Sequence, residues 1–208
     1  DRLRLGDLVS DDDLPNLPYL QLEEDSTEHK YLHSRRKELG GYVPSRISRF
    51  SDNLQMPALE AFESLLGEQK REISTTLAFV RALNILLKDK SIGERIVPIV
   101  ADEARTFGME GLFRQIGIYN PHGQNYVPQD RDAVSYYKED LTGQVLQEGI
   151  NEMGAMSSWV AAATSYSTND LPMVPFYIYY SMFGFQRVGD MAWLAGDQQA
   201  RGFLLGAT

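Results

Sequence analysis

The stretch VLQEGINEMGAMSSWVAAATSY, from Val145 to Tyr166, joins a short apolar segment to a glycine turn and then to a long Ala-rich segment. Asn151 has the side chain of a helix N-cap, and the apolar residues after it recur at three- and four-residue spacings. This apolar stripe consists of Ala155, Met156, Trp159, Val160, Ala163 and Tyr166. The stretch therefore predicts a strand, a tight turn and an amphipathic helix, the repeating unit of a parallel α/β sheet.

Two acids, Glu148 and Glu152, lie where the predicted strand turns into the helix. Counting back from Ala155 and Met156 by three and four places Glu152 on the apolar stripe, whereas the direction of Glu148, before Gly149, is not fixed. Two interpretations of Glu152 stay open. It could interact only with the helix dipole and free backbone N–H groups. Alternatively, burial and the positive helix end oppose each other, and the carboxyl group could then donate and accept a proton.

Strands and helices alternate on both sides of this stretch. Strands are predicted at Ile96–Ala101, Gln144–Gln147, Val174–Tyr180 and Gly202–Ala207. Helices are predicted from Pro57 through Leu66, over Ile73–Leu87, from Asn151 to about Ser167 and from Gln186 to about Ala200, and a loop-rich stretch is predicted over Thr106–Lys138. Such an alternation is typical of an α/β fold in which helices cover both faces of a parallel sheet.

Ligands of such sheets bind beyond the carboxyl ends of the strands. This rule selects Asp102-Glu103, the turn from Glu148 to Glu152, and the residues from Tyr180 to Phe183. The first pair could instead cap the next turn of the chain. The aromatic residues could instead be core packing, which is a more frequent role for such side chains.

The composition excludes several classes of function. The 208 residues carry a net charge of −9, which disfavours both nucleic acid and an anionic membrane surface as partners. There is no cysteine, so disulfides, zinc–thiolate sites and cysteine nucleophiles are excluded. The sequence has no signal peptide and no apolar run long enough to span a bilayer, so we expect a cytoplasmic protein. Dinucleotide, P-loop and nucleophile-elbow motifs are absent, and the pair His29 and His33 has no evident third metal ligand.

The first 55 residues differ from the rest and are predicted to be a connector that wraps over a surface. They contain the run Asp11-Asp12-Asp13, which we interpret as a solvated turn or helix start, and a short polar helix opened by Ser26. Residues 56–208 are predicted to form the α/β domain. Because the chain starts at Asp1 rather than Met and ends directly after an apolar run, we expect it to be a fragment.

Four long segments carry a resemblance to a known family. They are EISTTLAFVRALNILLKDK (72–90), IVADEARTFGMEGLFRQIGIY (99–119), YYKEDLTGQVLQEGINEMGA (136–155) and ATSYSTNDLPMVPFYIYYSMFGFQRVGDMAWLAGDQQARGFL (163–204). They resemble the homodimeric type of pyruvate dehydrogenase, the decarboxylating first component of the bacterial complex. LPYL, EEDSTEHKYLHSRR and GYVPSR in the connector fit the same family more loosely. The resemblance implies a transketolase-like, thiamine-binding α/β fold. Residues 1–55 would then be the tail of a diphosphate-binding domain, and 56–208 a pyrimidine-binding domain that is incomplete at its C-terminal end.

The resemblance also implies site residues. The family's glutamate lies in a G-[IV]-x-E pattern, here Gly149 to Glu152, and bonds a pyrimidine nitrogen of thiamine diphosphate. That bond promotes the imino tautomer, which takes the proton from the thiazolium carbon before the attack on pyruvate. The implied catalytic residues are Glu152, Glu103 and Tyr180, and the implied cofactor contacts are Glu152, Ile150, Phe183, Asp102 and Arg187.

Other parts of the family's site are missing from this sequence. The GDG motif, followed later by Asn, that holds Mg²⁺ and the diphosphate is absent, so the metal ligands are expected outside this chain. The resemblance further implies a homodimer whose subunits share the site, and a lipoyl-bearing acetyltransferase component as the acetyl acceptor. Two alternatives stay open: another thiamine diphosphate enzyme, such as a transketolase or a different 2-oxo acid dehydrogenase, or a non-catalytic dimerisation module when the chain is isolated.

Overall fold

The computed structural model describes residues 8–42, 48, 50–51, 53–67, 72–102, 104–129 and 136–207. The chain divides into two units, Asp1–Ser45 and Arg46–Thr208. The first unit holds η2 (Leu14–Asn16) and α1 (Thr27–Glu38). Asp11 to Asp13 form an exposed turn before η2, and Ser26 caps α1, as the sequence predicts. All twelve residues of α1 are described, and none is buried. The predicted division between residues 55 and 56 stays a prediction.

A parallel sheet forms the framework of the second unit. Its strand order is β4-β1-β5-β6, with β1 (Ile96–Val100), β4 (Leu146–Gln147), β5 (Val174–Tyr180) and β6 (Phe203–Ala207). All three pairings are parallel, and Ile99 lies beside both Leu146 and Tyr177. Every residue of β1 is buried, as expected for a central strand with helices on both faces. The four predicted strands are therefore confirmed.

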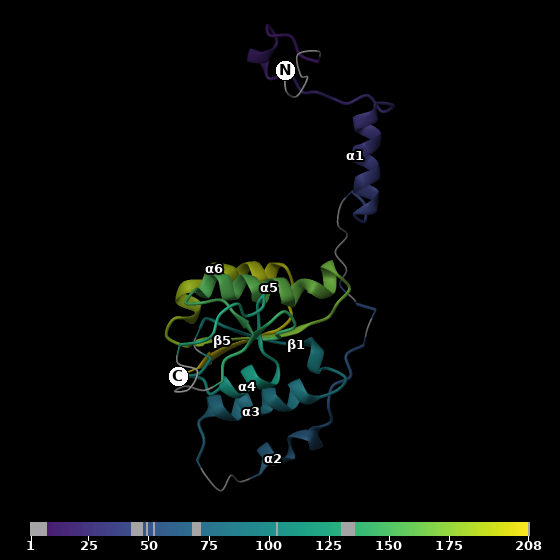
Figure 1. Cartoon of the computed structure of the whole chain (residues 1–208). Coiled ribbons are helices and arrows are strands. Elements are labelled where there is room, and N and C mark those ends of the chain that lie inside the picture. The colour runs from purple at the N-terminus through teal and green to yellow at the C-terminus, as the bar shows by residue number, and fades with distance from the viewer. Residues whose placement is uncertain are drawn as a thin grey trace. The chain divides into compact units, whose positions relative to one another are not determined.

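Helices cover both faces of this sheet (Figure 1). One face carries α3 (Thr75–Lys88) and α4 (Glu110–Gln115), and the other carries α5 (Glu152–Thr168) and α6 (Gly184–Asp197). The side chains of β1 alternate between the two cores: Ile96 and Val100 pack on the α3 side, and Val97 and Ile99 on the α5 side. The predicted apolar stripe of α5, from Ala155 to Tyr166, is buried.

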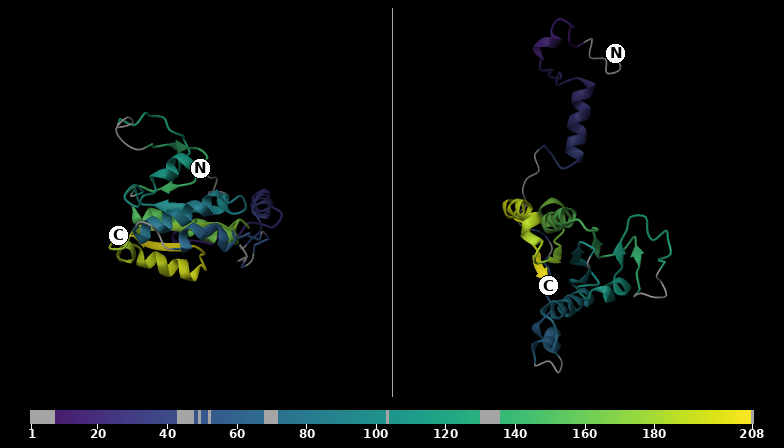
Figure 2. Two further views of the ribbon diagram at one scale, coloured as in Figure 1. Left: turned by 90° about the horizontal axis from the view of Figure 1, so that it is seen from below. Right: turned by 90° about the vertical axis from the view of Figure 1, so that its left-hand side faces the viewer.

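Short elements are where the sequence prediction was incomplete. The predicted loop over Thr106–Lys138 contains α4 and β2 (Ile118–Tyr119), and β2 pairs in parallel with β3 (Glu139–Asp140). In both views of Figure 2 this teal segment projects away from the main sheet. Instead of one helix from Pro57, the chain forms η3 (Leu59–Phe62) and α2 (Glu63–Leu66), and η4 (Gly93–Arg95) precedes β1. Elements of two to six residues are too short to show a hydrophobic period.

Ser48 and Ser51 are bonded to residues of the second unit that follow α5 and precede β6. The backbone N–H of Ser51 donates to Asp170 Oδ1 at 2.8 Å, and the Ser51 hydroxyl donates to Oδ2 at 2.5 Å. Arg201 donates to the carbonyl of Ser48 at 2.9 Å and lies 3.9 Å above the ring of Tyr166. The two bonds from Ser51 stabilise the charged carboxylate and so lower the pKa of Asp170.

The close approach at Gly143 gives a first testable prediction. A Cβ added there would lie 2.2 Å from the carbonyl carbon and oxygen of Ile118, so the backbone would have to move. At Gly111 in α4, an added Cβ would meet no described atom within 4 Å. We expect Gly143→Ala to lower the free energy of unfolding by about 1–3 kcal/mol. The matched Gly111→Ala should raise it by about 0.5–1 kcal/mol. Denaturant unfolding of the two variants measures both; equal effects would contradict the close contact.

The Ser51–Asp170 contact gives a prediction with a pH dependence. Because the folded pKa of Asp170 is lowered, its contribution is present above the unfolded pKa of about 3.9 and is lost as the pH falls through the folded value. At neutral pH, Asp170→Ala should speed hydrogen exchange of the Ser51 amide, and the difference from the wild type should shrink in acid. Asp190→Ala, an exposed aspartate of α6, is the control. Unchanged exchange in Asp170→Ala would show that the contact does not hold this segment.

Candidate active site

A cavity of about 160 Å³ opens at the carboxyl ends of β1 and β5. It is lined by Ala101, Phe107, Ile150, Glu152, Ile178, Tyr179, Tyr180, Phe183 and Arg187. Five of the seven site residues expected from the sequence are among them: Ile150, Glu152, Tyr180, Phe183 and Arg187. These five come from the turn before α5, the end of β5 and the start of α6. The cavity therefore lies where the rule for parallel sheets places a ligand.

Glu152 and Phe183 are joined through Arg187. The Glu152 side chain is only 15% exposed, and its Oε1 accepts a hydrogen bond from the Arg187 guanidinium. The same guanidinium lies 4.1 Å above the centroid of the Phe183 ring, a distance at which a cation is attracted to the ring face. One cation thus contacts both the acid and the aromatic face of this cavity.

The start of α5 sets the position of Glu152. Asn151 Oδ1 accepts from the backbone N–H of Gly154 at 2.9 Å, so the helix begins with Glu152 at its positive end. The Tyr177 hydroxyl lies 3.5 Å from the backbone carbonyl of Glu152, at the outer limit of a hydrogen bond. Burial, and then the negative charge of Glu152, raise the pKa of Tyr177 well above its usual range. The hydroxyl of Tyr177 therefore stays neutral and can donate to the backbone carbonyl of Glu152.

The turn before α5 places Ile150 at its apex. Gly149 has a φ of +70°, a backbone conformation that glycine adopts without strain. The N–H of Asn151 donates to the carbonyl of Gly149 at 2.8 Å, which closes a three-residue turn around Ile150. The Ile150 side chain is 77% exposed and lines the cavity. An apolar side chain is thus held outward by the backbone rather than packed into the core.

Aromatic rings form a further wall of the cavity. The ring of Tyr180 lies 5.1 Å from that of Phe107 and forms a T-shaped pair with that of Phe183 at 6.2 Å, centroid to centroid. The sequence reasoning missed Phe107, because it lies in the stretch read as a loop. Its place seven residues after the end of β1, the central buried strand, is the signal that could have drawn attention to it.

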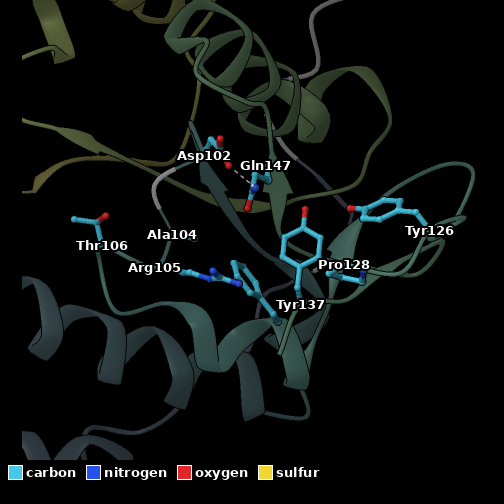
Figure 3. Close-up of a pocket in the computed structure, with 9 residues that line it drawn as sticks. Asp102, Ala104, Arg105, Thr106, Tyr126, Pro128, Tyr137 and Gln147 are labelled. Atoms are coloured by element: carbon cyan, nitrogen blue, oxygen red, sulfur yellow. Dashed lines mark hydrogen bonds between the residues drawn. The ribbon is translucent and has the colours of Figure 1, made fainter. Parts of the chain in front are cut away.

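Asp102 lines a second cavity, of about 410 Å³, rather than the first (Figure 3). Its Oδ1 accepts from Gln147 Nε2 at 2.7 Å, and its backbone has a φ of +62°. The other expected residue of this strand end, Glu103, lies outside the described residues. The remaining residues that line the second cavity are Ala104, Arg105, Thr106, Phe113, Tyr126, Pro128, Tyr137 and Gln147.

Two tyrosines of the second cavity share one carboxylate. Tyr126 and Tyr137 donate to Glu139 Oε1 at 2.9 and 3.0 Å, and Asn120 donates to Oε2 at 2.7 Å. Burial and the hydrogen bond to Glu139 raise the pKa of both phenols. The bonds tie the segment after β2 to β3, so one wall of this cavity belongs to the projecting segment.

Comparison with known proteins supports this architecture. A model of the family described as "Pyruvate dehydrogenase E1 component middle domain" matches residues 54–208, most of the chain. The chain belongs to this family. The family relation covers the whole sheet and every described residue that lines either cavity, so both cavities are features of a middle domain.

Similar curated proteins carry the name pyruvate dehydrogenase E1 component. This chain is 68% identical over 200 residues to the one from Escherichia coli K12, which is 96% of this chain and 22% of that protein. The protein from Haemophilus influenzae is 66% identical and that from Pseudomonas aeruginosa 60%, with 96% of this chain and 23% of each protein covered. The chain thus spans about a fifth of the length of these relatives.

Two further observations concern the described residues of this chain. Within the part of the chain that the structure describes, no helix is long and apolar enough to cross a membrane. The same residues contain no group of three or more histidine, aspartate or glutamate side chains that could hold a metal ion.

Proposed function

We propose that this chain is the aminopyrimidine half-site of a thiamine diphosphate-dependent pyruvate dehydrogenase (acetyl-transferring). The full protein would decarboxylate pyruvate and pass the acetyl unit to a lipoyl group. The observation that carries the proposal is the convergence of an acid, an aromatic face and an exposed apolar side chain on one cavity: Glu152, Phe183 and Ile150. The names of the relatives support it, although this chain corresponds to only about a fifth of their length.

The residues of the cavity fit an aminopyrimidine. A flat heteroaromatic ring needs a ring to stack on, and Phe183 offers one. Its weakly basic nitrogen needs a hydrogen-bonding partner, and Glu152 is the carboxyl group that lines this cavity. Ile150 would supply an apolar contact that holds the bent cofactor.

Thiamine diphosphate, when bound, supplies the carbanion chemistry of the decarboxylation. In this proposal Glu152 holds a proton at the ring nitrogen. When that proton is given up, the positive end of α5 stabilises the carboxylate that Glu152 becomes. The hydroxyl of Tyr180 and the carboxyl group of Glu103 are proposed to lie near the reacting carbon. Water exclusion by Phe107 and Phe183 would strengthen these polar interactions.

Arg187 contacts both Glu152 and Phe183, the two residues that the proposal assigns to the aminopyrimidine. Its guanidinium bonds the Glu152 carboxylate and lies over the Phe183 ring. Cofactor binding would therefore exchange a cation for a neutral ring at this position. Because the Arg187 side chain is 45% exposed, it can move outward without leaving a large buried gap.

In this proposal the Mg²⁺ ion and the diphosphate would be held by residues outside this chain, because the GDG motif followed by Asn that holds them in the family is missing from its sequence. We propose that a partner subunit supplies them within a cytoplasmic homodimer. The exposure of Phe185 and Trp193 on α6, 62% and 81%, supports an interface close to the cavity, because Arg187 belongs to the same helix. A lipoyl-bearing acetyltransferase component would be the further partner.

A substitution of Glu152 tests the proposed function directly. In the full-length protein, Glu152→Gln keeps the size of the side chain but cannot exchange a proton with the ring nitrogen. We expect the rate of pyruvate decarboxylation to fall by about 10²–10³-fold, as when another preorganised polar group is removed. Glu94→Gln, an exposed glutamate of η4, is the matched control and should leave the rate unchanged.

Near-normal turnover of Glu152→Gln would contradict the assignment. The wild-type protein should also prefer pyruvate to longer 2-oxo acids and to sugar phosphates. Preference for one of these would favour another thiamine diphosphate enzyme instead.

Hybrid dimers test the shared site. If each site takes Glu152 from one subunit and its diphosphate ligands from the other, a dimer that pairs a Glu152→Gln subunit with a subunit lacking its diphosphate ligands retains one intact site. If each site lay within one subunit, both sites of this dimer would be lost. Such hybrids, purified with two different affinity tags, should show about half of the wild-type activity, because a two-fold dimer contains two equivalent sites. Monomeric full-length protein with full activity would refute the shared site.

A further inference from the structure

Glu148 makes a contact that the proposed function does not use. Its backbone N–H donates to the carbonyl of Val100 at 3.1 Å, which extends the pairing of β4 with β1 by one residue. Its side-chain Oε1 accepts a hydrogen bond from the hydroxyl of Ser158, which lies in the second turn of α5. Both groups are partly buried. A carboxylate at the end of a strand is thus bonded to the side of the helix that the next turn leads into.

This contact restrains one end of the turn around Ile150, and Asn151 restrains the other end by capping α5. Between these two restraints, Gly149 is not held in place by packing, since a Cβ added there would meet no described atom within 4 Å. The backbone of Gly149 therefore depends on its neighbours for its position.

We propose that Glu148 is a positioning residue: its bond to Ser158 fixes the turn that presents Ile150 and the start of α5 to the aminopyrimidine. The inference rests on the proposed function, because it concerns the same cavity. Glu148 does not itself line that cavity. It acts through Ile150 and Glu152.

The helix itself has no need of this bond. Hydroxyl groups inside α5 can bond the carbonyl four residues earlier, as Ser157 does with Met153 at 2.7 Å and Thr164 with Val160 at 2.8 Å. Asn151 already caps the helix. What the Ser158–Glu148 bond adds is a link between α5 and the turn, whose loss would loosen the turn more than the helix.

The test uses the full-length protein with thiamine diphosphate and saturating Mg²⁺. Glu148→Ala and Ser158→Ala each remove the Ser158–Glu148 hydrogen bond. Ser157→Ala removes a hydroxyl from the preceding position of the same helix. We expect the first two to raise the KM for thiamine diphosphate about tenfold, the effect of losing one charge-assisted hydrogen bond. Their kcat at saturating cofactor should change much less. Ser157→Ala should leave KM within about twofold, because its hydroxyl bonds only its own helix.

Two further variants separate positioning from charge and from general stability. Glu148→Gln keeps an oxygen that can accept from Ser158, so it should recover most of the cofactor affinity. The double variant Glu148→Ala/Ser158→Ala should be no worse than either single change, as expected for two partners of one bond. The near-ultraviolet circular dichroism of the bound cofactor should change in the alanine variants and return in Glu148→Gln.

The outcomes separate this inference from the proposed function. A wild-type protein without thiamine diphosphate-dependent decarboxylation would overturn the proposed function. An active wild type with unchanged cofactor KM in Glu148→Ala and Ser158→Ala would overturn only the positioning role. A lower melting temperature in these variants with unchanged KM would show a structural bond, and an equally poor Glu148→Gln would show an effect of charge; both results contradict the inference.

Discussion

The parallel pairing of β1 with both β4 and β5 is the constraint on which the rest of the domain depends. Because all three strands run in the same direction, their carboxyl ends reach one edge of the sheet. Segments as distant in sequence as residues 101, 150 and 183 can then line one cavity. The same pairing buries β1 on both faces, so the edge that carries the polar side chains is built on a fully buried strand.

Two acids at this edge have different surroundings. Glu152 is little exposed and lies at the positive end of α5, where it bonds the guanidinium of Arg187. Glu148, by contrast, accepts a hydrogen bond from the hydroxyl of Ser158 in α5, and its backbone N–H donates to the carbonyl of Val100 in β1. Four residues apart, one carboxylate faces a cavity and the other holds the turn between strand and helix, and the single glycine between them lets the chain change direction.

Helices and strands could be predicted well from the sequence wherever one regular spacing of apolar residues extends over the whole element. The buried β-branched run of β1 and the apolar stripe of α5 decide their own structure, because burying them requires a sheet and a covering helix. The position of Glu152 followed from counting along that stripe. The two-residue strands β2 and β3 have no such period. They pair with each other, and Ile118 of β2 also pairs with Val145, a contact between distant residues that no local pattern predicts. Contacts such as Asp102 with Gln147 join residues 45 positions apart, and only the folded sheet brings them together.

Arg187 joins two parts of the cavity wall, the start of α5 and the start of α6. A carboxylate that is only 15% exposed requires a hydrogen-bonding or charged partner, and the face of an aromatic ring attracts a cation. Arg187 satisfies both from a single exposed helix position, with a flat group that has a charge for Glu152 and a planar face for Phe183. A lysine could pair with the acid but could not stack as a planar group on the ring. The guanidinium therefore links the acid and the aromatic ring that line this cavity.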